Sequence, residues 1–226
     1  MNILLIGYGR MGRLVESLAH EYGATVVGHV DRSNAASEWP EADVAIDFST
    51  ADAVATTLAR LAERGTNVVI GTTGWRAQEA DMRRLAQRIG VVGAPNFAIG
   101  VNLFALLVER AGELFKDHPS FGTWIHELHH AAKKDAPSGT ALQLEVALRT
   151  GGLDRAIDIA STRAGSIPGT HTVGFDSPAE TITLTHAARD RSGFARGALE
   201  AARWVQGKRG WFGMADVLGG RRRATL

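Results

Sequence analysis

A stretch near the middle of the chain, from Glu127 to Ala141, gathers residue types that suit proton transfer and anion binding. It reads Glu-Leu-His-His-Ala-Ala-Lys-Lys-Asp-Ala-Pro-Ser-Gly-Thr-Ala. Histidine can exchange a proton near neutral pH, and Lys133 and Lys134 add positive charge beside the histidines. An anionic substrate that must be protonated would suit this combination.

The apolar run from Ala141 to Leu148 predicts a helix directly after this stretch. Asp135 or Ser138 could cap its N-terminus. The backbone amides of Gly139 and Thr140 would then lie at the positive end of the helix dipole. Such amides bind a carboxylate or a phosphate.

Two other interpretations of the histidines stay open at this point. His129 and His130 could be ordinary polar residues at a strand end, with the lysines on a solvated edge. Alternatively, His126-Glu127-x-x-His130 matches the H-E-x-x-H signature of zinc metallopeptidases, which requires a helix so that both histidines reach one metal. Gly122 to Ile125 is rich in strand formers, and a strand would place His126 on the face opposite Glu127 and His129. The sequence therefore favours an accidental match, and we predict no metal site.

The chain opens with a second chemical motif. Asn2 to Ile6 is an unbroken apolar run, typical of a buried parallel strand. It leads into G-x-G-x-x-G and then an amphipathic helix from Arg13 to Tyr22. In this context the glycines allow a tight turn, close approach of a pyrophosphate and close helix packing, although glycines could also serve only a turn. The predicted cofactor residues of this loop are Gly7, Tyr8, Gly9, Arg10, Met11 and Gly12.

A second strand, Thr25 to Val30, ends at Asp31 and Arg32. An acid about twenty residues beyond the glycines accepts the adenosine ribose hydroxyls of NAD, whereas an arginine can pair with the 2′-phosphate of NADP. We therefore expect NADH, NADPH or both as cofactor. The alternative is an ordinary surface turn.

Further strands at residues 43–48, 67–70 and 90–93 alternate with helices, which predicts a doubly wound parallel sheet with ligands at the carboxyl ends of its strands. The pattern changes after Phe97. A long apolar helix over 98–116, the strand carrying His129, strands at 170–175 and 180–186, and a last helix at 195–206 predict a smaller α+β domain with an open mixed sheet. Residues 151–152 and 163–169 are expected in loops, and 221–223 in a solvated tail.

Composition limits the class of protein. The chain has 226 residues, with 45% apolar and 22% charged residues, no cysteine and a formal net charge of +1. These values are ordinary for a globular enzyme and give no global case for nucleic-acid or membrane binding. No signal peptide precedes the first strand, and no apolar run approaches the roughly 20 residues of a membrane helix. A cytoplasmic location is therefore expected.

The stretch from Glu127 to Ala141 resembles the signature of the 4-hydroxy-tetrahydrodipicolinate (dihydrodipicolinate) reductase family. That signature, Glu-x-His-His-x-x-Lys-x-Asp-Ala-Pro-Ser-Gly-Thr-Ala, is matched at every specified position. The resemblance runs from Ile3 to about Leu218. It implies a Rossmann nucleotide domain at 1–97 and 191–226, and a substrate-binding and oligomerisation domain at 98–190.

This resemblance also implies an activity and roles for individual residues. Members reduce a small cyclic dicarboxylate with NADH or NADPH in lysine and diaminopimelate biosynthesis, and they form homotetramers through the second domain. The resemblance implies proton handling by His129 and Lys133, and carboxylate binding by His130, Gly139 and Thr140. The residues similar to those that hold the nicotinamide half of the cofactor are Gly71, Thr72, Thr73, Ala94, Pro95, Asn96 and Phe97.

The chain departs from the family pattern in two ways. It lacks an excursion after Asp31-Arg32 and most of a loop ahead of Arg163. The family's Gly-Glu-His also reads Gly169-Thr170-His171 here, so a carboxylate is missing. Two other classes remain as alternatives: another nicotinamide-dependent amino or keto acid dehydrogenase, which would not need the signature, and a non-enzymatic NAD-binding sensor.

Overall fold

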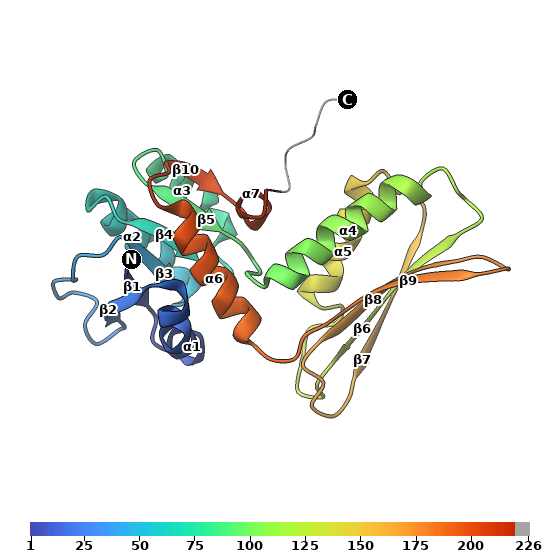
Figure 1. Ribbon diagram of the computed structural model, residues 1–226, viewed down its shortest axis with the longest axis horizontal. Helices are drawn as coiled ribbons and strands as arrows, with labels where there is room; N and C mark the ends of the chain where they lie inside the picture. Colours follow the sequence, from blue (N-terminus) through green and yellow to red (C-terminus); the bar gives the residue numbers. More distant parts are fainter. Residues whose placement is uncertain (220–226) are drawn as a thin grey trace. The chain divides into compact units, whose positions relative to one another are not determined.

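The chain folds into two compact units. The computed structural model describes residues 1–219, so the expected tail at 221–223 lies outside the described residues. The first unit comprises Met1–Ile99 together with the chain from Ser192 onward, and the second comprises Gly100–Arg191. Each unit has its own sheet and its own helices (Figure 1).

The first unit is built on a six-stranded sheet in the order β10-β5-β4-β3-β1-β2. Every pair of neighbouring strands is parallel. All the carboxyl ends of these strands therefore meet at one edge of the sheet. The strands are β1 (Asn2–Ile6), β2 (Thr25–Val30), β3 (Val44–Asp47), β4 (Asn67–Ile70), β5 (Gly90–Gly93) and β10 (Gly210–Phe212).

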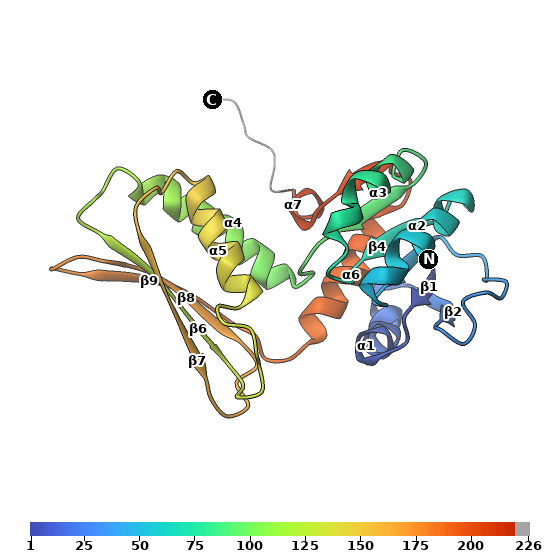
Figure 2. The same ribbon diagram turned by 180° about the vertical axis from the view of Figure 1, so that it is seen from behind.

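Helices cover both faces of this sheet, as Figures 1 and 2 show from opposite sides. Ile3 and Leu5 of β1 join the core formed with α1 and α6, whereas Leu4 and Ile6 join the core formed with α2 and α3. Burial on both faces explains why β1 is apolar at successive positions. The helical segments are α1 (Arg10–Ala19), η1 (His20–Tyr22), α2 (Ala51–Glu63), η2 (Arg76–Gln78), α3 (Glu79–Leu85), α6 (Ser192–Val205) and α7 (Met214–Val217).

The second unit has a four-stranded mixed sheet in the order β7-β6-β8-β9. β6 runs parallel to β7, while the other pairs are antiparallel. Two helices pack on one face of the sheet and form a single core with it. The elements are α4 (Ile99–Phe115), β6 (Gly122–His129), α5 (Gly139–Thr150), β7 (Ile157–Arg163), β8 (Thr170–Asp176) and β9 (Thr181–Ala187). The predicted fold class is confirmed in both units.

Three local expectations need correction. The sequence did not predict β7 or β10, and Arg163 ends β7 instead of belonging to a loop. β7 is an edge strand with few apolar residues, and β10 has three residues, so neither carries a strong periodic signal. Helix α1 begins at Arg10 and not at the expected Arg13, so part of the glycine motif forms the first helical turn.

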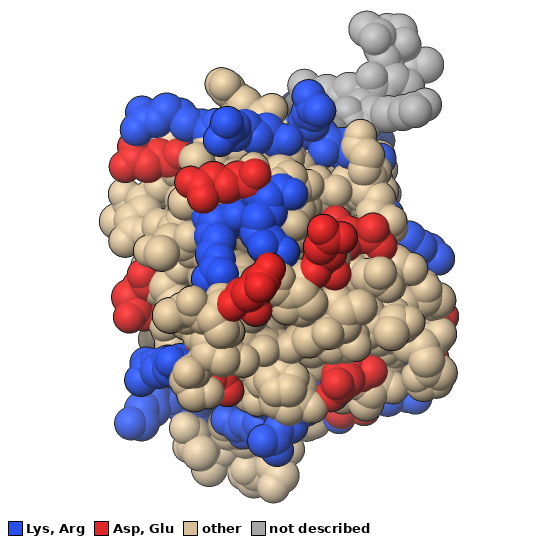
Figure 3. All heavy atoms as spheres, turned by 90° about the vertical axis from the view of Figure 1, so that its left-hand side faces the viewer, with Lys and Arg blue, Asp and Glu red and all other residues tan. Residues whose placement is uncertain are grey.

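On the face drawn in Figure 3, acidic and basic side chains both occur, and several basic ones lie close together along its upper edge. Within residues 1–219, no helix is long and apolar enough to span a membrane.

Candidate active site

The glycine loop between β1 and α1 leaves open space at a helix N-terminus. Gly7 has φ +86°, and a Cβ there would lie 2.5 Å from the carbonyl oxygen of Phe48. A Cβ on Gly12 would lie 2.4 Å from the carbonyl oxygen of Gly7. Gly9, the N-cap of α1, has no atom within 4 Å of its Cβ position. The loop therefore fits a dinucleotide pyrophosphate, which needs close approach to backbone amides beside a positive helix end.

The predicted ribose-binding residues follow the neighbouring strand. Asp31 and Arg32 are exposed directly after β2, which pairs with β1. The hydroxyl and the amide of Ser33 donate hydrogen bonds of 2.6 and 2.7 Å to Oδ1 of Asp31, and they lower its pKa. Tyr8 stacks on His29 with ring centroids 4.2 Å apart. An ionised acid and an exposed arginine thus stand beside the glycine loop.

A buried carboxylate that the sequence analysis missed joins two of the predicted loops. Asp47, at the end of β3, is 1% exposed. Its Oδ1 accepts hydrogen bonds from the amide and hydroxyl of Ser49 and from Oγ1 of Thr72, and its carbonyl accepts from the amides of Gly71 and Thr72. Burial raises the pKa of Asp47 despite these hydrogen bonds. The Asp47 side chain therefore fixes the loop after β4 against the loop after β3.

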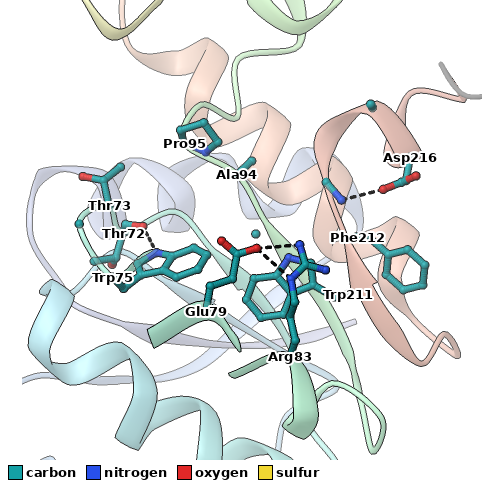
Figure 4. Close-up of a pocket in the computed structure, with 14 residues that line it drawn as sticks. Thr72, Thr73, Trp75, Glu79, Arg83, Ala94, Pro95, Trp211, Phe212 and Asp216 are labelled. Carbon is teal, nitrogen blue, oxygen red and sulfur yellow. Dashed lines mark hydrogen bonds and ion pairs between the residues drawn. The ribbon is translucent and has the colours of Figure 1, made fainter. Parts of the chain in front are cut away.

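A cavity of about 400 Å³ lies beside the loop after β4 within the first unit (Figure 4). Trp75 donates its indole N–H to the carbonyl of Thr72 at 2.6 Å and meets Trp211 edge to face. Arg83 lies over the Trp211 ring and pairs with Glu79. The predicted residues that line the cavity are Thr72, Thr73, Ala94 and Pro95; those not predicted include Trp75, Glu79, Arg83, Trp211 and Asp216.

Two other predicted cofactor residues are engaged within the protein. Phe97 is 2% exposed and packs in the core of the first unit. Asn96 uses Oδ1 to accept the amide of Ala98 at 2.9 Å. Sequence position alone could not separate backbone roles from side-chain roles here.

The histidine-rich signature of the second unit begins on β6. Ile125 and Glu127 are buried on the face that packs under the helices. His126 lies on the opposite face, where its Nε2 is 2.9 Å from Oγ1 of Thr162. Because H-E-x-x-H chemistry requires both histidines on one helical face, the strand excludes the zinc metallopeptidase interpretation.

Glu127 is the centre of a buried polar cluster. It is 0% exposed, and its carboxylate accepts two hydrogen bonds from Arg163, 3.0 Å at Oε2 and 2.6 Å at Oε1. It also accepts the amide of Ser138 at 3.1 Å and a hydrogen bond from Nδ1 of His129. Burial by itself would raise the pKa of Glu127, but hydrogen bonds from Arg163, Ser161 and His129 lower it to about 2. Glu127 is therefore ionised near neutral pH.

Two histidines share this cluster. Burial lowers the pKa of His129, as do the positive charges of Lys133 and Arg163, while Glu127 opposes them. His171 is 4% exposed, with Nε2 3.0 Å from Oγ of Ser138, and burial is the main cause that lowers its pKa to about 4. Both imidazoles are therefore mostly neutral at pH 7.

The same atoms could be considered as metal ligands. One ligand atom from each of Glu127, His129 and His171 lies within 4.8 Å of the others. However, both oxygens of Glu127 already bind the Arg163 guanidinium, whose charge would repel a cation. This donor set fits proton transfer better than metal binding.

The loop after β6 brings the signature lysine to the cluster. Nζ of Lys133 donates to both carboxylate oxygens of Asp135 at 2.7 Å. Ser138 is the N-cap of α5, accepting the amide of Ala141 at 3.2 Å, so Asp135 is not the cap. Gly139 and Thr140 open the helix, and their amides consequently have no acceptor within it.

His130 and the position of the missing family carboxylate lie at the margins of this site. His130 is partly exposed at the end of β6, where its carbonyl accepts the Lys133 amide at 3.1 Å. Thr170 stands where the family has a glutamate. Because successive strand residues alternate in direction, Thr170 faces away from the side on which His171 meets Ser138. A carboxylate at position 170 would therefore not point into the Glu127 cluster.

A parallel sheet with a dinucleotide loop, joined to a unit with a buried histidine–carboxylate cluster and a lysine, defines a two-domain nicotinamide-dependent reductase. The family model for the dihydrodipicolinate reductase N-terminus matches residues 1–97, and that for the C-terminus matches residues 100–218. The chain belongs to the dihydrodipicolinate reductase family, whose members are NAD(P)H-dependent oxidoreductases.

Relatives match over nearly the whole chain. The 4-hydroxy-tetrahydrodipicolinate reductase of Acidiphilium cryptum is 42% identical, covering 93% of this chain and 94% of the relative. The 4-hydroxy-tetrahydrodipicolinate reductase of Thermosipho africanus is 36% identical over 222 residues, which cover 96% of this chain and 98% of the relative. Another member of the family is therefore about as short as this chain. A dipicolinate-bound dihydrodipicolinate reductase from Paenisporosarcina sp. TG-14 has the same fold, with a TM-score of 0.78 at 21% identity over 96% of this chain and 98% of that chain.

Proposed function

We propose that this protein reduces 4-hydroxy-tetrahydrodipicolinate to tetrahydrodipicolinate, with loss of water, in lysine and diaminopimelate biosynthesis. Family membership supports the reaction. The observation that carries it is the gathering of His129, Lys133 and the N-terminus of α5 around one buried carboxylate, Glu127. A cyclic dicarboxylate needs both an anion site and a proton donor, and the second unit provides both.

The residues of the second unit divide these tasks. Bound NADH or NADPH supplies a hydride. Lys133 polarises the substrate ring, and His129 with Lys133 delivers the proton that the reduced ring requires. The amides of Gly139 and Thr140, together with His130, bind a substrate carboxylate at the positive end of α5.

Binding of the cofactor is assigned to the first unit. The pyrophosphate would be held by the loop from Gly7 to Gly12, with Arg10 close to a phosphate. Asp31 would accept the ribose hydroxyls and Arg32 would pair with a 2′-phosphate. The nicotinamide half would lie against the loops at 71–73 and 94–97.

The choice between NADH and NADPH can be tested at Arg32. Arg32→Ala should weaken NADPH more than NADH, because only NADPH presents a 2′-phosphate to the guanidinium. A charge-assisted hydrogen bond of this kind is worth about 1.5–3 kcal/mol, which corresponds to roughly 10- to 100-fold in affinity. Fluorescence titration with each cofactor measures both constants. Equal losses would show that Arg32 does not recognise the phosphate.

Assembly and location extend the proposal. We infer a cytoplasmic homotetramer formed through the second unit, where Trp124, Thr183 and Thr185 lie on the sheet face not covered by α4 and α5. Light scattering of the purified protein measures the assembly, and a monomer at micromolar concentration would contradict it.

The catalytic assignment rests most directly on Lys133. Lys133→Ala removes a proton donor and a charge beside His129, so turnover should fall by about 10²–10⁴-fold with little change in NAD(P)H affinity. Lys134→Ala is the matched control, because Lys134 is the adjacent lysine and is exposed. Steady-state rates with enzymatically generated substrate decide the matter. Normal turnover in Lys133→Ala would end the assignment.

A further inference from the structure

Three strands bring together charged and titratable groups to which the proposed chemistry assigns no role. Glu127 lies on β6, Arg163 ends β7, and His171 lies on β8. We propose that Glu127, held by Arg163, is the positioning residue that fixes the proton-transferring tautomer of His129. This inference rests on the proposed function of that histidine.

The hydrogen bond between Glu127 and His129 determines which nitrogen is available for chemistry. An ionised carboxylate only accepts hydrogen bonds, so Nδ1 of His129 must be the protonated nitrogen. The proton to be transferred is then carried by Nε2. A carboxylate hydrogen-bonded to Nδ1 orients a catalytic imidazole and stabilises its protonated form, as the aspartate does in serine proteases.

A glycine lies beside Nε2 of His129. Gly169 has φ +147°, and a Cβ there would lie 3.0 Å from Nε2 of His129. Both the backbone conformation and the close approach favour glycine at this position. A small residue therefore stands beside the nitrogen that the carboxylate leaves available.

Arg163 keeps the Glu127 carboxylate ionised, so that it can only accept hydrogen bonds. Without a charged partner, burial would favour the protonated form of Glu127, which could donate to Nδ1 and reverse the tautomer. The guanidinium binds both oxygens and also donates to the carbonyl of Asp135 at 2.6 Å. Because the Asp135 carboxylate holds Lys133, one arginine connects both proton-handling residues.

Charged and titratable groups from each neighbouring element act on this histidine. They are Glu127 on the same strand, Arg163 from β7, Lys133 from the loop after β6, and His171 from β8. The ring centroids of His129 and His171 are 5.1 Å apart. Glu127 is the anion in direct contact with His129, while the Asp135 carboxylate pairs with Lys133. Removing the charge of Glu127 therefore takes away the group that opposes the positive charges of Lys133 and Arg163 at His129.

The first test reads the tautomer directly in the wild-type chain. Imidazole ¹⁵N NMR at mildly alkaline pH should show His129 protonated at Nδ1 and unprotonated at Nε2, with the signal assigned by its loss in His129→Gln. An Nε2-protonated His129 would overturn the proposal. This readout does not depend on turnover, so it remains decisive if the wild-type chain lacks reductase activity and the proposed function fails.

The second test measures catalysis. Glu127→Gln keeps the size of the side chain but lets its amide donate to Nδ1, so turnover per folded enzyme should fall by at least about 10²-fold. The KM for NADPH should stay within about 2-fold, because the cofactor loops belong to the other unit. Loss of the anion beside His129 disfavours its protonated form and lowers its pKa. The pH above which turnover declines should therefore be lower in Glu127→Gln than in wild type.

A matched variant separates positioning from folding. Asp158→Asn also neutralises an acid of this sheet, at an exposed position near the start of β7, and should leave turnover and the pH profile unchanged. Loss of folded protein in Glu127→Gln with a wild-type rate and pH profile in the folded fraction would show a purely structural role and overturn the proposal. If Glu127→Gln does not fold, the wild-type tautomer decides alone.

Discussion

The two units each bury a carboxylate almost completely, yet they treat it in opposite ways. Asp47 is 1% exposed and Glu127 is 0% exposed. Burial raises the pKa of Asp47, whereas the pKa of Glu127 falls to about 2. Both residues lie at or near the end of a strand that leads into a proposed binding loop. Burial alone therefore does not decide the charge of a carboxylate.

The difference lies in the partners. Oδ1 of Asp47 accepts hydrogen bonds from Ser49 and Thr72, all of them neutral donors. Glu127 also has neutral donors, but it meets the guanidinium of Arg163 at both oxygens. Neutral donors offset only part of the desolvation penalty, whereas a bidentate charge partner reverses its outcome. Asp47 thus serves to join loops, and Glu127 provides a permanent charge.

The largest expected effect comes from neutralising each carboxylate by amide substitution. Glu127→Gln leaves Arg163 without its charge partner and should lower the free energy of unfolding by about 3–4 kcal/mol at neutral pH. Asp47→Asn keeps an oxygen acceptor where burial already disfavours the charge, so the loss should be below about 1 kcal/mol. Urea unfolding of both variants measures the contrast. If both variants lost the same free energy of unfolding, the charge pair of Glu127 and Arg163 would contribute nothing to stability.

The second prediction concerns stability in acid. His171 has a pKa of 6.5 in the unfolded chain and about 4 when folded, so between these values the unfolded state binds the additional proton. The free energy of unfolding should therefore fall as the pH drops from 6.5 to 4, by up to about 3 kcal/mol.

The two buried carboxylates contribute to the pH dependence of stability with opposite signs. The contribution of Glu127 is present above 4.5 and is lost as the pH falls toward 2. The raised pKa of Asp47 means that its contribution is instead lost as the pH rises above 3.8. Urea unfolding across the window from 6.5 to 4 should show a shallower slope in His171→Asn than in wild type. An unchanged slope would place the acid sensitivity elsewhere.

The fold could largely be predicted because most strands of the first unit are marked by apolar runs within the strand itself. The bounds of β1, β4 and β5 follow apolar runs typical of buried parallel strands, and those of the edge strand β2 follow a run rich in valine. The sequence did not indicate β7, which has few apolar residues, or β10, whose three residues are too short to show a period. Their places depend on pairing with β6 and β5, which is a tertiary property.

The residues of the candidate site also fall into two groups, those within one continuous motif and those brought together by strand pairing. His129 and Lys133 stand in one continuous signature, so sequence could propose them together, and their roles stay predictions. Arg163 reaches Glu127 across 36 positions of sequence because β7 pairs in parallel with β6 and sets Arg163 beside His129. His171 arrives because β8 pairs it with Glu127. Strand register creates this cluster, and no local pattern encodes register over such separations.

The smallest expected effect tests whether neutral donors really govern Asp47. Thr72→Val keeps the shape of the side chain but removes the hydroxyl that donates to Oδ1 at 2.9 Å. The free energy of unfolding should fall by about 1 kcal/mol, and more at neutral pH than in acid, because this hydrogen bond lowers the pKa of Asp47 and so favours its ionised form. Thr73→Val is the matched control, since Thr73 is the adjacent threonine and is exposed. Urea unfolding at both pH values should separate the two variants. If Thr72→Val and Thr73→Val lose the same free energy of unfolding at both pH values, the Thr72 hydroxyl does not support the Asp47 carboxylate.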